Sequence, residues 1–208
     1  MRVILAEKPS VAQSIAAVLG ADQKKNGYLQ GENDLVSWCI GHLIELAPPE
    51  IYDARYAKWR REDLPIVPSA WESVVSDGTK KQFAVLKDLL NRTDVDEVVC
   101  ATDAGREGEL IFRMVYEKTG CTKPVKRLWI SSLEESAIRE GFRSLKPGST
   151  YDALYRAALC RAQADWLVGI NGTRLYSRLY GTKLNVGRVM TPTLAMVVQR
   201  EKEIAAFQ

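Results

Sequence analysis

The chain has 208 residues, of which 46% are hydrophobic and 26% charged, a composition typical of a globular protein with a buried core. No hydrophobic run approaches the roughly 20 residues needed to cross a bilayer, and the N-terminus has no signal-peptide pattern. The sequence therefore excludes a membrane protein and predicts a cytoplasmic one. The four cysteines lack metal-ligand spacing, so we expect reduced, structural thiols and no zinc site.

The formal net charge of +3 is unevenly distributed. Residues 1–150 hold 21 Lys or Arg and 22 Asp or Glu, whereas residues 151–208 hold eight and four. This excess predicts a basic surface toward the C-terminus, which suits a nucleic-acid partner. A solvated basic face is the alternative that charge alone leaves open.

The first segment predicts a strand followed by a helix. Residues 2–6 form a short apolar run that ends at Glu7. We expect the next helix to be capped by Ser10, with Gln13 reaching back in a capping box, and to end at Gly20. Because Lys8 precedes a proline, its backbone is kept out of helical geometry, which could aim its ammonium group at nearby carboxylates.

Residues 28–46 alternate in polarity and predict a hairpin, with a turn at 31–34 and a returning strand at 35–40. His42 is the only histidine in the chain and follows this strand, where it could be structural or could reach a phosphate. Residues 48–68 predict a loop on the domain surface, and residues 80–91 predict a helix.

The central stretch combines a buried strand at residues 98–101 with a cluster of acids. Asp103 follows the strand, and Glu107 opens the next helix. In an open α/β sheet, ligands bind outside the carboxyl ends of the strands. If the strand before Glu7 is a parallel neighbour, Glu7, Asp103 and Glu107 converge and offer the oxygen ligands that Mg²⁺ prefers.

Helix capping is the simpler explanation for any one of these acids. Glu7 and Asp103, however, stand at two equivalent strand ends, with Lys8 and Arg106 beside them. Mixed acids and bases at one site suit phosphate chemistry, in which cations neutralise charge on oxygen. We therefore favour a metal and phosphate site.

The residues that follow predict a helix ending near Gly120, a strand at 125–130, and a helix that a capping box at 132–135 opens. KPGS at residues 146–149 is the strongest boundary signal. Because strands and helices alternate before it, we predict an α/β domain over residues 1–146, with a mostly parallel sheet flanked by helices. A partial all-α domain is predicted over residues 147–208.

Two long helices around a basic loop are predicted in this second part. The first covers residues 151–170, where Arg161 and Asp165 lie one turn apart and could simply pair. The second is expected to start with Thr191 as its N-cap, directly after Arg188. This arrangement would make a phosphate site, and a flexible loop before a capped helix is the alternative.

Five segments resemble motifs of the type IA DNA topoisomerases, most closely the bacterial topoisomerase III branch. They are AEKPS (6–10), GHLIELAP (41–48), ATDAGREGE (101–109), DWLVGIN (165–171) and VGRVMTPTL (186–194). Each is weak alone, but five in this order are highly specific and span nearly all of the chain. The resemblance implies a Toprim-type metal-binding fold for residues 1–146 and the start of a helical domain that grips single-stranded DNA.

The resemblance also implies residue roles. Glu7 would act beside the scissile phosphate, as a metal ligand or proton donor, and Lys8 would stabilise phosphate charge. Asp103 and Glu107 would hold Mg²⁺. The single-strand groove would include His42, Trp59, Arg161, Asp165, Arg174, Asn185, Val186, Gly187, Arg188, Val189 and Met190. The family commonly has a second aspartate where this chain has Gly105, so we expect looser metal binding.

The enzyme implied by this resemblance cuts one DNA strand through a 5′-phosphotyrosyl intermediate, passes another strand and reseals the break with Mg²⁺ and without ATP. None of the eight tyrosines stands in the family's nucleophile motif. We therefore expect the remaining topoisomerase domains downstream, and expect this chain to bind Mg²⁺ and single-stranded DNA without cleaving it. The alternatives are a Toprim nuclease or primase-like factor and a non-catalytic DNA-binding module.

Overall fold

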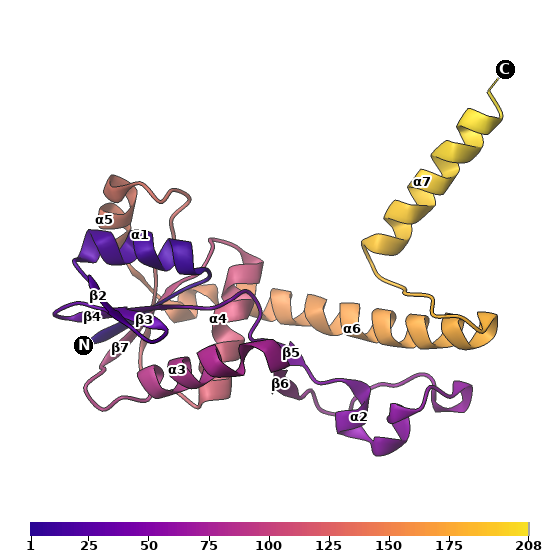
Figure 1. Cartoon of the computed structure of the whole chain (residues 1–208), viewed down its shortest axis with the longest axis horizontal. Helices are drawn as coiled ribbons and strands as arrows, with labels where there is room; N and C mark the ends of the chain where they lie inside the picture. Colours follow the sequence, from indigo (N-terminus) through magenta and orange to yellow (C-terminus); the bar gives the residue numbers. More distant parts are fainter. Residues whose placement is uncertain (208) are drawn as a thin grey trace. The chain divides into compact units, whose positions relative to one another are not determined.

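The computed structural model describes residues 1–207, and their contacts group into two compact units (Figure 1). Unit 1 comprises Met1–Glu45 and Ser73–Leu159, and unit 2 comprises Leu46–Glu72 and Cys160–Gln208. The segment predicted as a surface loop thus groups with the C-terminal residues, whereas the predicted domain boundary at residues 146–147 stays a prediction. Within residues 1–207, no helix is both long and apolar enough to span a membrane.

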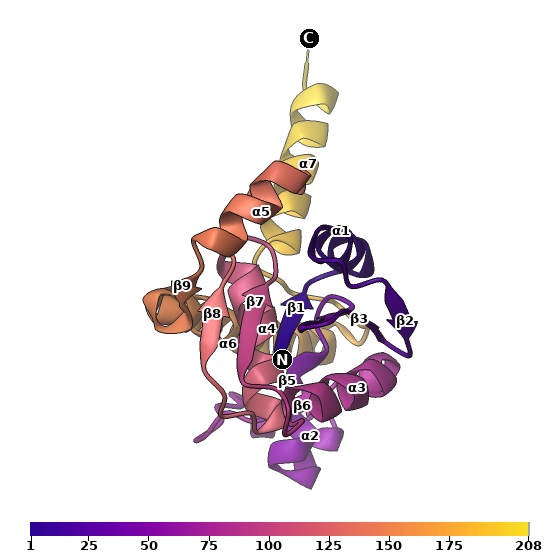
Figure 2. The same cartoon turned by 90° about the vertical axis from the view of Figure 1, so that its left-hand side faces the viewer.

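Unit 1 contains a seven-stranded sheet in the order β2-β3-β4-β1-β7-β8-β9 (Figure 2). The central strands β4, β1, β7 and β8 run parallel, and the edge strands pair antiparallel. This arrangement confirms the predicted mostly parallel sheet. The strands are β1 (Arg2–Ala6), β2 (Gln23–Lys25), β3 (Tyr28–Gln30), β4 (Asp34–Trp38), β7 (Glu97–Ala101), β8 (Val125–Arg127) and β9 (Lys146–Pro147).

Helices cover both faces of this sheet, which is why β1 and β7 consist almost entirely of apolar residues. Helices α1 (Pro9–Leu19) and α5 (Glu135–Arg143) pack on one face, and α3 (Lys80–Leu90) and α4 (Arg106–Thr119) lie on the other (Figure 2). Ile15 and Ile138 from the first pair join Ile4 and Val99 of the sheet in one fully buried cluster. Burial of each such side chain contributes about 1.5–3 kcal/mol relative to exposure.

The predicted start of α1 is wrong by two positions. The helix begins at Pro9 with Lys8 as its N-cap, so Ser10 lies inside the first turn and the predicted capping box is absent from the described residues. Proline supplies the φ of a first helical position, which starts the helix earlier than the serine signal suggested. The end of the helix at Gly20 is confirmed, because Gly20 adopts a left-handed φ of 71°.

Two further N-caps also differ from the prediction. Helix α5 follows Glu134, and Ser132 Oγ instead accepts a hydrogen bond from the Glu134 amide at 3.2 Å, within a turn before the helix. Helix α7 (Met190–Ala205) begins before Thr191, whose amide already donates to Gly187 O at 3.1 Å. In both places a local turn sets the start of the helix.

Short strands were the other weakness of the sequence prediction. The hairpin of β3 and β4 is confirmed, although β4 ends at Trp38. Strand β2 was not predicted. Neither was the two-stranded sheet of β5 (Ile44–Leu46) and β6 (Ser73–Val75). Three-residue strands carry too few residues to establish an alternating pattern.

Unit 2 is built on the C-terminal part of α6 (Asp152–Tyr180), which runs past the predicted end at residue 170. Asn171 and Gly172 are poor helix formers, but both make tertiary contacts. The Asn171 side chain accepts a hydrogen bond from Ile66 N at 2.6 Å and donates one to Ile66 O at 2.9 Å. A Cβ at Gly172 would lie 2.9 Å from Val186 Cγ1. These contacts offset the low helix propensity of the two residues.

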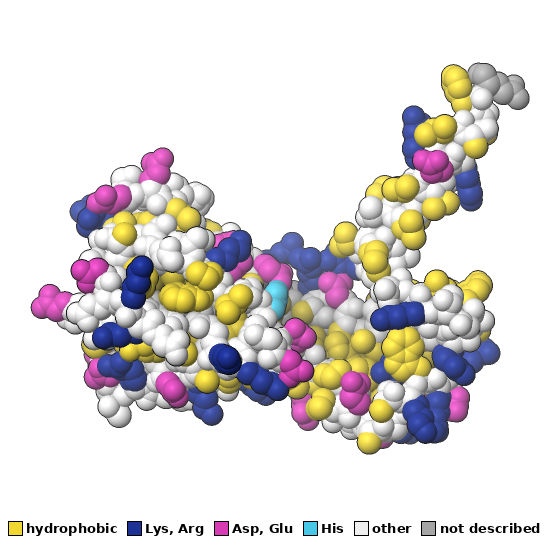
Figure 3. Space-filling model, in the orientation of Figure 1, with side chains coloured by type: hydrophobic (Ala, Val, Ile, Leu, Met, Phe, Trp, Pro, Cys, Tyr) yellow, Lys and Arg dark blue, Asp and Glu magenta, His cyan; other side chains and the backbone are white. Residues whose placement is uncertain are grey.

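The other elements of unit 2 are α2 (Pro49–Tyr52), two 3-10 turns (Ala54–Ala57 and Arg61–Asp63) and α7. Helix α7 carries apolar side chains along its length (Figure 3). Leu194, Val197 and Ile204 are all more than half exposed. The apolar spacing of this helix therefore does not reflect burial within residues 1–207.

Candidate metal and nucleic-acid site

Strands β1 and β7 end side by side, and the residues after them form the candidate site. Ala6 pairs with Ala101 in parallel register, so the carboxyl ends of both strands lie at one edge of the sheet. Glu7 follows the first strand, and the Asp103 amide donates to Glu7 Oε2 at 3.3 Å. The structure thus brings Glu7 and Asp103 together, across a separation of 96 residues in sequence.

Lys8 lies between these two carboxylates. Its Nζ is 4.0 Å from Glu7 Oε1 and 3.9 Å from Asp103 Oδ2. The backbone of Lys8 is extended, with φ −133° and ψ 151°, as expected for a residue that precedes a proline. The Glu7 side chain is only 12% exposed, whereas those of Lys8 and Asp103 are each 58% exposed. The site is therefore open on the side of the lysine.

Glu107 lies in the first turn of α4 and contacts His42 instead of the other two acids. Its Oε1 is 2.6 Å from His42 Nε2, and the single histidine of the chain is visible at the surface (Figure 3). Among the side chains that the structure describes, no group of three His, Cys, Asp or Glu residues is arranged to hold a metal. The structure thus joins Glu7 with Asp103 and pairs the third predicted ligand, Glu107, with His42.

The donor set at the strand ends fits magnesium. Mg²⁺ is commonly held by one or two carboxylates together with substrate phosphates and several waters, and the carboxylates of Glu7 and Asp103 are compatible with this kind of site. Softer ligands do not compete here. Cys100 is buried in β7, and this burial raises the pKa of its thiol to about 11, which keeps the sulfur protonated at neutral pH.

A buried ionic cluster beneath the loop of Asp103 was not predicted. Arg127 at the end of β8 is 0% exposed, and its Nε lies 3.1 Å from Glu109 Oε2 of α4. Glu109 Oε1 also accepts a hydrogen bond from Arg113 at 3.0 Å. The sequence does contain a signal for this cluster, namely a basic residue within the strand-like run VKRLWI. If such an arginine is buried, it requires an acidic or carbonyl partner.

Gly108 permits α4 to contact the same loop directly. A Cβ at this position would lie 2.2 Å from Asp103 O, and Thr102 Oγ1 donates to Gly108 O at 2.8 Å. A side chain of any size would therefore collide with backbone atoms. The second glycine of the AGREG segment holds the helix against the loop that carries Asp103.

In unit 2, Asp165 lies between two arginines. Arg188 Nε donates to Asp165 Oδ1 at 2.6 Å, and Arg161 Nε is 3.9 Å from Asp165 Oδ2. The predicted pairing of Arg161 with Asp165 is thus present, but the closer partner is Arg188. Both arginine side chains remain about half exposed, so their other N–H groups are available to phosphate oxygens.

Side chains of α6 hold the loop that contains residues 185–190. Thr173 Oγ1 accepts a hydrogen bond from Val186 N, and Ser177 Oγ accepts one from Leu184 N, both at 2.9 Å. The Gly187 amide donates to Thr191 Oγ1 at 3.0 Å. These bonds fix the loop backbone and leave four of its side chains exposed, those of Asn185, Arg188, Val189 and Met190.

Arg174 is buried and packs against Trp59, unlike the exposed arginines Arg161 and Arg188. The Arg174 side chain is 6% exposed, and its Nη1 donates to Tyr56 O at 2.7 Å. Its guanidinium carbon lies 5.4 Å from the centre of the Trp59 ring, and burial lowers the pKa of Arg174. This geometry favours a packing role for both residues, and DNA contact by either stays a prediction.

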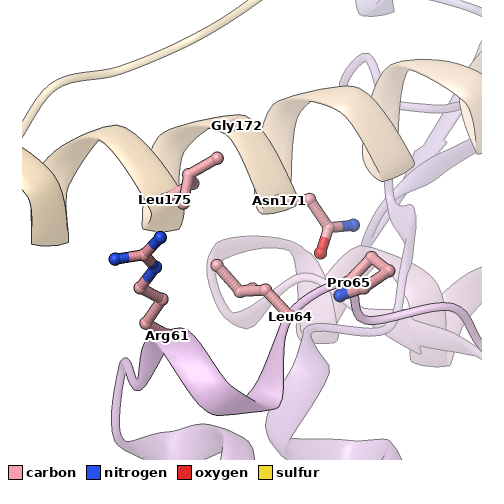
Figure 4. Close-up of a pocket in the computed structure, with 6 residues that line it drawn as sticks. All are labelled: Arg61, Leu64, Pro65, Asn171, Gly172 and Leu175. Atoms are coloured by element: carbon pink, nitrogen blue, oxygen red, sulfur yellow. The ribbon is translucent and has the colours of Figure 1, made fainter.

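A cavity of about 340 Å³ opens beside α6 in unit 2 (Figure 4). The Arg61 side chain extends toward α6 and ends near Leu175, with Leu64 beside it. Apolar surface next to an arginine plane is the kind of surface on which unstacked nucleobases lie. The cavity is lined by Arg61, Leu64, Pro65, Asn171, Gly172 and Leu175, none of which was predicted as a site residue.

Comparison with known proteins supplies the family. Residues 2–133 match the Toprim domain family, and residues 149–208 match the family described as DNA topoisomerase. The chain belongs to the Toprim domain family. This membership confirms the Toprim-type α/β fold that the sequence motifs predicted, followed by a helical region.

The Toprim chain is similar over its length to bacterial enzymes named DNA topoisomerase 3. It is 52% identical to that of Bacillus thuringiensis (strain Al Hakam) over 206 residues, 53% to that of Shouchella clausii over 206 residues and 52% to that of Bacillus subtilis over 205 residues. Each match covers 99% of this chain and 28% of the relative. The chain is thus homologous to the N-terminal part of a type IA topoisomerase, which confirms the predicted branch.

A solved structure agrees with this relationship. The full-length topoisomerase I from Thermotoga maritima matches with a TM-score of 0.68 and 26% sequence identity. The match covers 99% of this chain and 31% of that protein. The chain therefore spans less than a third of the length of the topoisomerases that it resembles.

Proposed function

We propose that this Toprim chain supplies the metal- and phosphate-binding part of a type IA DNA topoisomerase. The whole protein would cut one DNA strand through a 5′-phosphotyrosyl intermediate, pass another strand and reseal the break with Mg²⁺ and without ATP. The observation that carries the proposal is the meeting of Glu7, Lys8 and Asp103 at the carboxyl ends of two neighbouring parallel strands. Homology to the topoisomerases over nearly the entire chain supports it.

Each residue of the site has a proposed task. Glu7 and Asp103 would hold Mg²⁺, which when bound would offset charge on the phosphate oxygens. Lys8 neutralises part of the charge of the two carboxylates, so that an anionic phosphate can approach them, and its ammonium group then contacts a phosphate oxygen. In the alternative role, a protonated Glu7 that does not bind the metal would give a proton to the leaving sugar oxygen. Glu107, which His42 holds, is proposed as a further acidic ligand.

Unit 2 would bind the single-stranded DNA. Arg161 and Arg188 present exposed guanidinium groups that Asp165 orients. The other exposed side chains of the 185–190 loop would contact the same strand. The cavity beside Arg61 would accept one unstacked base. Because arginine contacts to phosphate release counterions, affinity for an oligothymidine should fall steeply with salt.

Magnesium binding by the purified chain tests the proposal. We expect calorimetric titration to show that Glu7→Gln weakens Mg²⁺ binding at least about tenfold, the effect typical of losing a group that supports a metal site. Glu32→Gln is the matched control, because this exposed acid precedes β4 and therefore lies near the amino ends of the parallel strands, whereas Glu7 lies at their carboxyl ends. Equal affinities of wild type and Glu7→Gln would contradict the proposal.

Metal-dependent nicking of DNA without a covalent adduct would favour the nuclease alternative.

Gly105→Asp is expected to strengthen Mg²⁺ binding roughly tenfold, because it adds a carboxylate beside Asp103 and near the cation. Gly105 is the N-cap of α4 with an extended backbone of φ −179°, and a Cβ there would meet no described atom within 4 Å. Asn is as good an N-cap as Asp, so Gly105→Asn should match its stability without the gain in affinity. An equal gain from both variants would show that charge is not the cause.

A further inference from the structure

Arg127 is the largest fully buried side chain in the described structure. Three of its five hydrogen bonds reach the segment that carries Asp103. Its Nη1 donates to Cys100 O at 3.1 Å and to Thr102 O at 2.8 Å, and its Nη2 donates to Asp103 O at 2.7 Å. Nη1 also reaches Leu128 O at 2.7 Å. A single side chain thus contacts one carbonyl at the end of β7 and two carbonyls of the β7–α4 connection.

Cys100 O already accepts a hydrogen bond from Leu128 N at 2.9 Å. The carbonyls of Thr102 and Asp103 need a partner because β7 ends at Ala101. Buried carbonyl groups without a partner are costly, and the guanidinium satisfies those of Thr102 and Asp103. Its donors form a rigid planar fork, so they constrain the direction of the loop as well as its position. A lysine could not replace this fork, because all its donors sit on one nitrogen atom.

The same guanidinium also fixes α4. Its Nε donates to Glu109 Oε2 at 3.1 Å, and Glu109 lies in the first turn of the helix together with Glu107. Arg113 supports Glu109 from the next turn and donates to Asp152 at 2.8 Å. Arg127 therefore connects the loop of Asp103 to the helix turn of Glu107.

Stability alone does not explain a buried arginine at this place. A buried ion pair can often be replaced by apolar side chains of similar volume without loss of stability. Apolar side chains would not, however, hold the carbonyls of Thr102 and Asp103. The arrangement of its donors thus indicates that Arg127 fixes the position of the loop that carries Asp103.

We propose that Arg127 is a positioning residue that sets the placement of Asp103 and, through Glu109, of Glu107 for binding metal and phosphate. This inference rests on the proposed function, since it concerns the same site. Arg127 itself contacts neither of the two carboxylates. Its effect is exerted through backbone carbonyls and Glu109.

Arg127→Lys tests this role, because it keeps a positive charge near Glu109 and removes the fork. We expect the variant to fold and to bind Mg²⁺ at least about tenfold more weakly, measured by calorimetry below its own melting temperature. Amide hydrogen exchange at residues 102–104 should also become faster.

Arg2→Lys is the control. Arg2 makes a two-bonded pair with Asp34, at 2.8 and 3.0 Å, at the opposite end of β1. This variant should lower the melting temperature without changing Mg²⁺ affinity, which separates positioning from general stability.

The outcomes separate the two proposals. Wild-type Mg²⁺ affinity in folded Arg127→Lys would overturn the positioning role and leave the proposed function intact. Failure of wild type to bind Mg²⁺ would overturn the proposed function. If Arg127→Lys does not fold, the double variant Arg127→Met with Glu109→Met removes both buried charges. Weaker binding by that folded variant supports the inference, and unchanged binding overturns it.

Discussion

Gly108→Ala is expected to lower the free energy of unfolding by at least about 2 kcal/mol, although alanine is the better helix former by ~1 kcal/mol. The reason is the absence of space, because the new Cβ would lie 2.2 Å from the backbone oxygen of Asp103. Overpacking usually costs about 1–3 kcal/mol, and more where no flexible side chain can move away. Urea unfolding followed by circular dichroism measures this loss.

Gly169→Ala is the matched control for this result. Gly169 is also a helical glycine, but its added Cβ would lie at an ordinary contact distance of 3.6 Å from Val186 O. This substitution should leave stability unchanged or raise it by up to ~1 kcal/mol. If Gly108→Ala were as stable as Gly169→Ala, α4 could not be in direct contact with the loop of Asp103.

Glu109→Ala is expected to destabilise the protein by about 3–5 kcal/mol, because it leaves a fully buried arginine without its counter-charge. Arg127 is 0% exposed, and Arg113 loses the same partner. Chemical denaturation again gives the measurement. Glu140→Ala serves as the control, since Glu140 is an exposed acid of α5 whose loss should change stability by less than ~0.5 kcal/mol.

The double variant Glu109→Met with Arg127→Met decides whether charge causes this loss. Removing both buried charges should recover much of the stability that Glu109→Ala loses. A double variant as unstable as Glu109→Ala would assign the cost to altered shape.

The two strands that precede the site could be predicted because each is marked by its own short run of apolar residues. The runs before Glu7 and Asp103 are short, continuous and apolar, as strands buried on both faces require. Their parallel pairing then follows from the helix that each strand precedes. The meeting of Glu7 with Asp103 could therefore be predicted from two strand ends alone.

Contacts that depend on tertiary packing could not be predicted in this way. Asn171 binds the backbone of Ile66 across 105 residues of sequence, and an asparagine within a helical pattern indicates an end more often than an anchor. Arg127 was overlooked because a strand arginine usually faces solvent. The pairing of Glu107 with His42 likewise requires the turn at Gly41, whose φ is 70°.

The shared site of Glu7 and Asp103 is tested most directly by a paramagnetic ion. Mn²⁺ added to the isotopically labelled chain should broaden the amide signals of residues 7–8 and 103–104 together, and excess Mg²⁺ should restore them. Broadening of only one of these segments, or broadening elsewhere that Mg²⁺ does not reverse, would contradict a single site formed by the two strand ends.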